Sequence, residues 1–377
     1  MDRAAKTANI YRLGIKELRS LWRDPMMMIL IIYAFSFSIY VSGTAMPETL
    51  HKAPIAITDE DQSQLSRRIV SAFYPPHFVS PAMVGLDEVD RGMDAGHFTF
   101  ALDIPPGFQR DVLAGHRPTI QLNVDATRMS QAFSGGGYIQ QIVQAEVAEF
   151  TRGTRAGPPP PIELAVRQRF NPTLAQSWFG SLMAIINNVT MLSIILTGAA
   201  LIREREHGTI EHLLVMPITP FEIMAGKVWA MSLVVLMACA FALKIVVEGV
   251  LAVPVEGSAL LFLAGAGLHL FATTSMGIFM GTIARSMPQF GLLLMLVLLP
   301  LQMLSGGATP RESMPEFVQT VMLAAPTTHF VKMAQAILYR GAGFDVVWPQ
   351  FLAIAAIGAA FFIVALRRFG QTITTMA

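Results

Sequence analysis

The chain has 377 residues, of which 53% are hydrophobic and 14% are charged, and its formal net charge is +1. Soluble domains average about 25% charged residues, so this composition indicates long apolar segments. The small net charge gives no electrostatic support for binding nucleic acid, and the single cysteine, Cys239, excludes a disulfide or a cysteine-based metal site within one chain.

Residues 1–25 predict an amphipathic helix that lies on the cytoplasmic face of a membrane. Its apolar stripe is Tyr11, Ile15, Leu18 and Trp22, and its basic stripe is Arg12, Lys16, Arg19 and Arg23. Two such stripes side by side favour an interfacial helix on an anionic leaflet, and an ordinary solvated helix is the alternative.

Residues 26–46 predict the first transmembrane helix. The run from Met26 to Thr44 is uncharged and near the length of about 20 residues that a span needs. The lysines and arginines before it place its N-terminus in the cytoplasm. A cleavable signal peptide is the alternative, but its apolar core would be shorter, about 7–15 residues.

Residues 47–177 predict a soluble α/β domain outside the cytoplasm. The predicted strands are Ala53–Thr58, Phe98–Ile104 and Ile120–Val124, and the predicted short helices are Gln62–Phe73, Leu86–Ala95 and Gly107–Ala114. A long helix over Ala126–Thr151 is expected to be interrupted or hinged at the glycines 135–137. The mixed charge of this insert is compatible with translocation, because long domains do not follow the loop-charge rule.

Residues 178–377 predict five further spans. These are Trp178–Leu201, Met224–Val247, Ala259–Ile283, Phe290–Leu304 with a kink at Pro300, and Val347–Leu366. The segment Ser305–Phe344 is too polar to cross, and it predicts short helices at Phe317–Leu323 and Phe330–Tyr339. Lysine and arginine gather in the segments assigned to the cytoplasm, so both termini are expected there.

Between the second and third spans, residues 203–220 form a charged segment that cannot lie in hydrocarbon. Gly208 ends the exiting helix, Thr209 can cap a new one, and Pro217 stops it. Leu213 and Leu214 give that helix an apolar side. The pattern predicts a short amphipathic helix at the cytoplasmic surface, suited to receiving force from a soluble partner.

This segment resembles the corresponding loop of ABC-2 type permeases, the membrane subunits of one class of ATP-binding-cassette exporters. The family pattern is an acidic and basic run, then Glu-x-Gly-Thr, Leu-Leu and Pro. Here it is matched by Glu204, Glu206, Gly208, Thr209, Leu213, Leu214 and Pro217, which the resemblance implies couple the chain to its ATPase. The chain looks closest to the bacterial inner-membrane permeases of the multidrug-type branch.

The resemblance implies an α-helical polytopic membrane protein with six transmembrane helices, one before and five after an inserted periplasmic α/β domain. It also implies re-entrant helices between spans 5 and 6. A homodimer, or a heterodimer with a second permease, would form the pathway for an amphiphilic or lipophilic substrate, drug-like or lipid-like. A periplasmic adaptor protein and membrane lipid are the other implied partners.

No Gly-x-x-x-x-Gly-Lys-Ser/Thr motif occurs, so no P-loop enzyme activity is expected of this chain. ATP and its hydrolysis are therefore expected on a partner subunit, an inference that rests on the resemblance. No cofactor is expected here, and no metal, because His207 and His212 are not spaced to share a helix face.

Polar residues within the apolar spans are candidates for function. Asn187, Asn188 and His269 could line the pathway, or could join helices by hydrogen bonds. Lys244 and Glu248, four residues apart, predict an intramembrane ion pair near one end of the third span.

Two other classes of function remain as alternatives. A membrane-anchored scaffold or sensor would use the insert to bind a ligand or partner protein, without an ATPase. An intramembrane enzyme would need a catalytic motif, and none is evident.

Overall fold

The computed structural model describes residues 3–44, 52–75, 77–125, 129–154, 176–206, 218–307, 309 and 311–376. The chain divides into two compact units. The helical unit comprises Met1–Met46 and Arg169–Ala377, and the α/β unit comprises Pro47–Gln168.

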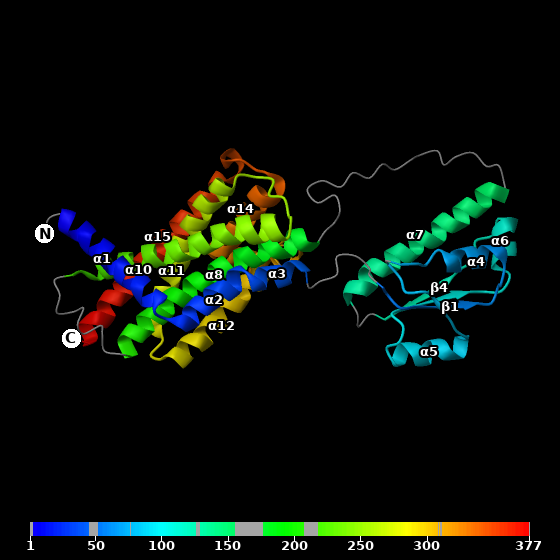
Figure 1. The fold of residues 1–377 in the computed structure, drawn as a ribbon, viewed down its shortest axis with the longest axis horizontal. Helices are drawn as coiled ribbons and strands as arrows, with labels where there is room; N and C mark the ends of the chain where they lie inside the picture. Colours follow the sequence, from blue (N-terminus) through cyan, green and yellow to red (C-terminus); the bar gives the residue numbers. More distant parts are fainter. Residues whose placement is uncertain are drawn as a thin grey trace. The chain divides into compact units, whose positions relative to one another are not determined.

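The helical unit begins with α1 (Arg3–Trp22), α2 (Pro25–Phe35) and α3 (Phe37–Thr44) (Figure 1). After the α/β unit it continues with α8 (Gln176–Glu206), α10 (Pro220–Phe241), the π-helix η1 (Ala242–Val250), α11 (Ala259–Ile283) and α12 (Met287–Leu304). The last elements are η2 (Arg311–Ser313), α13 (Glu316–Met322), α14 (Pro326–Arg340) and α15 (Phe344–Met376).

Six helical segments of the described residues are long and apolar enough to cross a membrane. The prediction of a polytopic helical protein with six spans is therefore confirmed at the level of length and composition. The fourth span, Ala259–Ile283, has the predicted boundaries, whereas the other five begin or end at other residues. The first span has a break at Ser36, between α2 and α3, and the third runs from Pro220 to Val250 because η1 continues α10.

Local sequence explains where these helices begin. Asp24 accepts a hydrogen bond from the Met27 backbone N–H at 3.2 Å, and Pro25 follows at the first position of α2. Thr219 and Glu222 cap the start of α10 reciprocally. Each cap satisfies backbone groups that the first turn of a helix leaves without partners.

The helical unit has two ends, which are named here by their helices. At the α1 end, α1 packs on α10 and the C-terminus of α8 lies beside the turn between α11 and α12. At the α14 end, the start of α8 touches α3, and α14 packs against α8, α11 and α15. There the phenol of Tyr339 donates to the carbonyl of Phe179, at 3.2 Å.

Glycine allows the central helices α8 and α11 to approach closely. A Cβ atom on Gly277 would lie 2.2 Å from Thr197 Oγ1 and 2.7 Å from the Ile194 carbonyl oxygen. Gly281 is one turn further along and faces Leu201 and Gly198. The Gly-x-x-x-Gly spacing thus serves helix packing.

The α/β unit holds a four-stranded sheet with the order β2-β1-β3-β4. Its strands are β1 (Ile55–Asp59), β2 (Ala82–Met83), β3 (Phe100–Ile104) and β4 (Gln121–Val124). β1 pairs in parallel with β2 and β3, whereas β4 is antiparallel to β3. The predicted strands appear with shifted ends, and the two-residue strand β2 was not predicted from the sequence.

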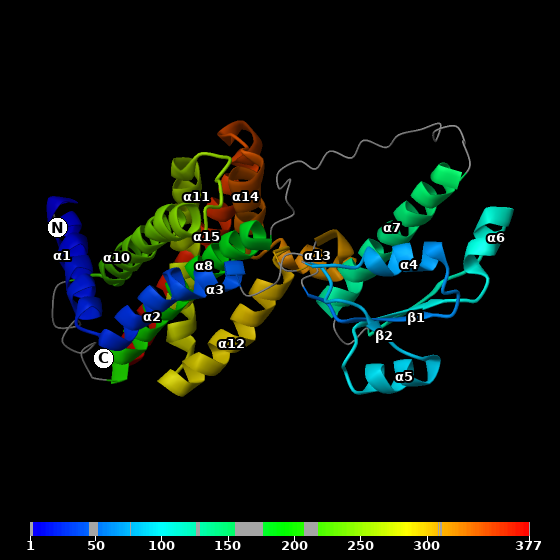
Figure 2. The ribbon, with the colours of Figure 1, turned by 45° about the vertical axis from the view of Figure 1, so that its right-hand side comes forward.

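Alternation along the strands sends side chains into two apolar clusters. Ile57 and Leu102 face the larger cluster, beneath α4 (Gln64–Ser71), α6 (Phe108–Ala114) and α7 (Met129–Thr154). Ala56 and Ala101 face the smaller one, beneath α5 (Leu86–Asp94). Figure 2 shows α4 and α7 on one side of the sheet and α5 on the other.

The expected interruption at residues 135–137 is wrong, because α7 runs without a break through all three glycines. Gly135 explains how closely α7 packs against the sheet. A Cβ atom there would lie 2.1 Å from Cζ of the fully buried Phe100 ring, so only glycine lets α7 approach the sheet. Gly137 meets nothing within 4 Å.

We expect Gly135→Ala and Gly137→Ala to change stability in opposite directions. Gly137→Ala should stabilise α7 by about 0.5–1 kcal/mol, because alanine loses less backbone entropy. Gly135→Ala should destabilise the α/β unit, because Phe100 has no room to move. Hydrogen exchange of the β3 amides in the full-length protein measures both effects, and equal protection in the two variants would contradict this packing.

Candidate functional site

The α1 end of the helical unit is the candidate site, because it holds both ends of the predicted coupling segment. α1 packs on α10 through Gly14, where a Cβ atom would lie 2.1 Å from the Trp229 ring. The indole Nε1–H of Trp229 donates to the Ile10 carbonyl at 3.1 Å, and its ring stacks on Tyr11. A glycine and an indole thus set the distance between these helices.

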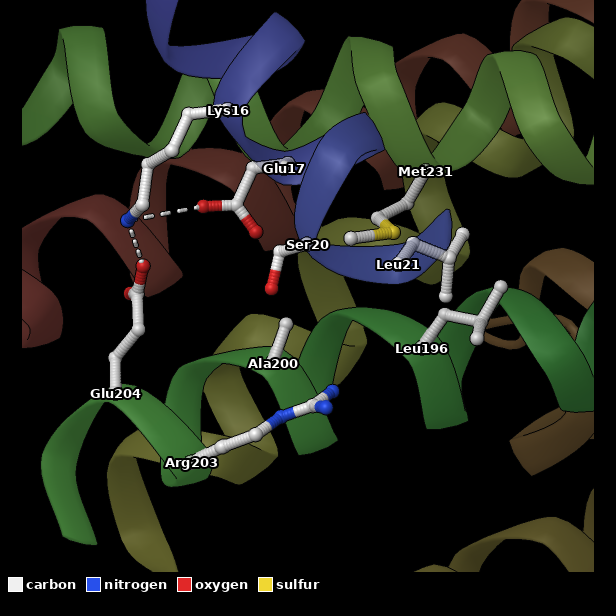
Figure 3. A pocket seen from close by; sticks show the side chains of 9 residues that line it. All are labelled: Lys16, Glu17, Ser20, Leu21, Leu196, Ala200, Arg203, Glu204 and Met231. Carbon is white, nitrogen blue, oxygen red and sulfur yellow. Dashed lines mark hydrogen bonds and ion pairs between the residues drawn. The ribbon is translucent and has the colours of Figure 1, made fainter. Parts of the chain in front are cut away.

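A cluster of four charged side chains lies near this contact, and we call it the α1–α8–α10 charge cluster. Its members are Lys16, Glu17, Glu204 and Lys227. Lys227 of α10 is 2% exposed. Its Nζ lies 2.9 Å from Glu17 Oε1 of α1 and 2.7 Å from Glu204 Oε2 of α8. Lys16 Nζ lies 2.5 Å from Glu204 Oε1 and 3.6 Å from Glu17 Oε1 (Figure 3). Each carboxylate therefore meets both ammonium groups.

The charge cluster links three segments that are far apart in the sequence. Burying an unpaired ammonium or carboxylate is costly, whereas two cations placed against two anions keep each charge compensated. Separation of α1 from α8 or α10 would leave the charge of Lys227 with fewer partners. The cluster therefore favours movement of these three helix ends as one body.

A cavity of about 270 Å³ lies beside the charge cluster. Figure 3 shows its polar side, with Ser20 and Arg203, and its apolar side, with Leu196 and Met231. Arg203 also forms an ion pair with Asp24, the residue that caps α2. This pair extends the ionic contacts of α8 to the start of the first span.

Further contacts hold the ends of the segment 207–217 in place. On the α8 side, Glu206 Oε1 accepts a hydrogen bond from the Met287 backbone N–H at 3.0 Å, at the start of α12. Nη1 of Arg205 donates to the Ala284 carbonyl at 2.9 Å. These two contacts attach the last turn of α8 to the α11–α12 turn.

On the α10 side, the Glu222 carboxylate is buried and receives three donors. Its Oε2 accepts from the Thr219 backbone N–H at 2.6 Å and from the Thr219 hydroxyl at 2.7 Å. Its Oε1 accepts from the Asn9 amide of α1 at 3.1 Å. The start of α10 is thus held by its own cap and by α1.

The predicted coupling residues fall partly outside the described part of the chain. Glu204 and Glu206 are described, and both make the contacts given above. Outside the described residues lie Gly208, Thr209, Leu213, Leu214 and Pro217, and also His207 and His212. The helix expected at that position remains a prediction.

The three predicted pathway residues lie within the helical unit, and two are buried. Asn188 is 7% exposed, and its amide donates to the Ala34 carbonyl of α2 at 2.6 Å. Asn187 is half-buried. Asn188 thus joins α8 to α2 by a hydrogen bond, which is one of the two roles that the sequence allowed for it.

His269 is fully buried between α8 and α14. Its Nε2 lies 2.9 Å from the Thr190 hydroxyl, and its ring stacks on Phe330 with the centroids 4.1 Å apart. One turn along α11, Ser193 donates to the Thr273 hydroxyl at 2.6 Å. These polar contacts join α8 to α11 along the axis of the helical unit.

Lys244 and Glu248 form an ion pair on η1. The side chain of Lys244 is exposed, whereas that of Glu248 is half-buried. The structure brings the two residues together at the α14 end of the third span, whereas the charge cluster lies at the other end of that span.

Sequence reasoning missed Glu17, Lys227, Asn9 and Glu222 as members of the site. One signal was available, because Glu17 is the one acidic residue of α1 and Lys227 is the one basic residue of α10. An isolated charge in an otherwise basic or apolar helix indicates a specific partner. Their pairing across 210 positions was not visible in any local pattern.

Comparison with known proteins gives a consistent result over almost the whole chain. The family model described as ABC-2 family transporter protein matches residues 25–367. The chain is 65% identical over 369 residues to "Inner membrane transport permease YhhJ" of Escherichia coli (strain K12), which covers 98% of this chain and 99% of that protein.

Two more distant relatives carry similar names. The chain is 27% identical over 350 residues to "Probable multidrug ABC transporter permease YbhR" of Escherichia coli (strain K12), covering 91% of this chain and 93% of that protein. It is 27% identical over 340 residues to "Probable multidrug ABC transporter permease YbhS" of the same strain, covering 87% and 88%.

We expect Lys227→Met to destabilise the helical unit, because Glu17 and Glu204 lose their shared buried cation. The free energy of unfolding should fall by about 3 kcal/mol, which is the lower end of the range for breaking a buried ion pair, because Lys16 remains beside both carboxylates. Thermal unfolding of the purified protein in detergent measures it. Lys16→Met is the matched control, with a loss below about 1 kcal/mol because its side chain is 45% exposed. Equal losses would contradict the central position of Lys227.

Proposed function

Because this chain belongs to the ABC-2 family of transporter proteins and is a membrane permease of an ABC transporter, we propose that it forms the translocation pathway as a dimer. The second subunit is another copy of this chain or a second permease. A separate ABC ATPase subunit binds and hydrolyses ATP, and this chain carries no cofactor of its own. The substrate is amphiphilic or lipophilic and is exported.

In this proposal the α1 end faces the cytoplasm and the α14 end faces the periplasm. The distribution of basic residues supports this orientation, because α1 carries Arg12, Lys16 and Arg19, and the end of α15 carries Arg367 and Arg368. The α/β unit is then periplasmic, where it could dock an adaptor protein. α13 and α14 are then the re-entrant helices, which are tolerated where protein covers them.

The observation that carries the coupling mechanism is the charge cluster at the ends of α8 and α10. The segment 207–217 joins these helices and is the place where the ATPase docks. A push on this segment reaches Glu204 and Lys227 together, because the two side chains are bound to each other. Glu17 transfers the same movement to α1.

The push also reaches α11 and α12. Glu206 is bonded to the first turn of α12 and Arg205 to the end of α11. Movement of the α8 terminus therefore changes the α11–α12 turn. Rigid-body movement of α8, together with the helices bonded to it, relative to the rest of the unit would switch access between the two faces of the membrane.

The dimer proposal is supported by the outer face of α12. This helix exposes five large apolar side chains, namely Leu292, Met295, Leu296, Leu299 and Met303. Such a face suits lipid on its own, and it also suits a second permease subunit. Copy number in mild detergent, measured by light scattering, distinguishes the two.

We expect Glu206→Ala to uncouple ATP hydrolysis from export. Without the carboxylate, the Met287 N–H loses its acceptor and the α8 terminus separates from α12. ATP hydrolysis by the reconstituted complex should continue while export of a lipophilic dye falls about tenfold, the equivalent of one hydrogen bond to a charged group. Glu206→Gln is the control, because its carbonyl oxygen can still accept. Wild-type export by Glu206→Ala would refute this contact as a coupling element.

The orientation can be tested by thiol labelling, because the native Cys239 is fully buried. Glu316→Cys places a thiol on the exposed surface of α13, and Arg12→Cys places one on the exposed surface of α1. A membrane-impermeant maleimide applied to intact spheroplasts should label the first variant and not the second. After lysis both should react. The reverse pattern would place the α1 end outside and exclude the proposed docking of the ATPase.

A further inference from the structure

The α14 end holds a second cavity, of about 460 Å³, between the start of α8, the end of α12 and one face of α14. On α14, the lining residues Thr328, Val331, Lys332 and Gln335 follow helical spacing, so they share one side of the helix. Phe179 of α8 contributes an aromatic wall. This cavity is separate from the charge cluster, which lies at the opposite end of α8.

The cavity gathers basic residues that are distant in sequence. Between the end of α12 at Leu304 and the start of α15 at Phe344, the lysines and arginines are Arg311, Lys332 and Arg340, and all three line it. Loops on the periplasmic side carry few basic residues under the loop-charge rule. Membrane topology therefore does not explain why these three basic residues line one cavity, whereas an anionic ligand would explain it.

These cations lack acidic partners among the described residues. No ion pair within 4.0 Å joins Arg311, Lys332 or Arg340 to a described carboxylate. Arg311 donates to the Gln319 carbonyl at 3.0 Å, while its Nε is buried without a partner in the described structure. Glu312 is the one acidic lining residue, so the cavity has an excess of positive charge.

A buried hydroxyl adds to the polar capacity of the cavity. Thr328 is 4% exposed, and its Oγ1 has no hydrogen-bond partner among the described residues. An unsatisfied buried hydroxyl costs about 1–3 kcal/mol unless a ligand or water pairs with it. A guanidinium, an ammonium, a second guanidinium and a hydroxyl together form a donor set suited to a phosphate or carboxylate group.

We propose that this cavity binds the anionic head group of an amphiphile, with the apolar part of that molecule against Phe179 and Val331. The cavity lies within the range of about 300–1,000 Å³ typical of small-molecule sites, which is more room than a free inorganic anion fills. This inference rests on the proposed permease function and adds a substrate class to it. A substrate leaving the pathway would meet these charges at the α14 end.

Equilibrium binding to the purified full-length permease, without its ATPase, tests the cavity separately from export. The probes are dihexanoyl phosphatidylglycerol, dihexanoyl phosphatidylcholine and inorganic phosphate, each titrated calorimetrically in a neutral detergent. The anionic lipid should bind most tightly. Its affinity should fall about tenfold in Lys332→Gln and again in Arg340→Gln, since each removes a charged donor. Glu312→Gln should raise it, because a repelling carboxylate is lost.

Lys332→Arg and Arg340→Lys are the matched controls, because they keep the charge and should retain affinity within about threefold. Melting temperatures of all variants show whether folding is preserved. Unchanged affinity in the Lys332→Gln/Arg340→Gln double variant overturns the proposal, and so does inorganic phosphate binding as tightly as the anionic lipid. Dye export by the complex, measured in parallel, tests the permease function separately. If the cavity variants bind the lipid like wild type while export persists, the cavity proposal fails and the permease function stands.

Discussion

The interaction on which the helical unit depends is the burial of Lys227 between Glu17 and Glu204. A lysine that is almost fully enclosed needs carboxylates close by, and here they come from α1 and α8. In the sequence the whole α/β unit lies between α1 and Lys227, and the segment 207–217 lies between α8 and α10. The requirement to compensate one charge therefore brings together the N-terminal helix and two spans. The ion pairs also fix the ends of α1, α8 and α10 relative to one another, whereas helices that touch only through apolar side chains could slide past each other.

The two ends of the helical unit use charge in different ways. At the α1 end, acidic and basic side chains neutralise one another, and the surrounding contacts hold α8, α10 and α12 in a defined arrangement. At the α14 end, the basic side chains of Arg311, Lys332 and Arg340 line a cavity and form no ion pair within 4.0 Å with a described carboxylate. The first arrangement suits the transmission of force, and the second suits recognition of an anionic group that enters and leaves.

Between these ends, some polar side chains of the spans form hydrogen bonds to other helices. Asn188 bonds to α2, and His269 bonds to Thr190 and stacks on Phe330. In a bilayer an unpaired polar group is costly, so such contacts both stabilise helix packing and specify it. A change of access during transport would have to preserve these bonds or exchange them. These bonds favour movement of α8 and α11 together as one body.

The amino-acid sequence by itself determined the properties that depend on neighbouring residues: the six apolar spans, the charged segment at 203–220, and the three longer strands of the insert. Only the tertiary structure decided that α7 passes unbroken through three glycines, that the apolar stripe residue Trp22 is exposed while Glu17 is buried, and that Arg311, Lys332 and Arg340 share one cavity. The physical reason is the distance along the sequence over which each interaction acts. Hydropathy and capping act within a few turns, whereas the cost of a buried charge or an added Cβ atom depends on which distant helix lies against it.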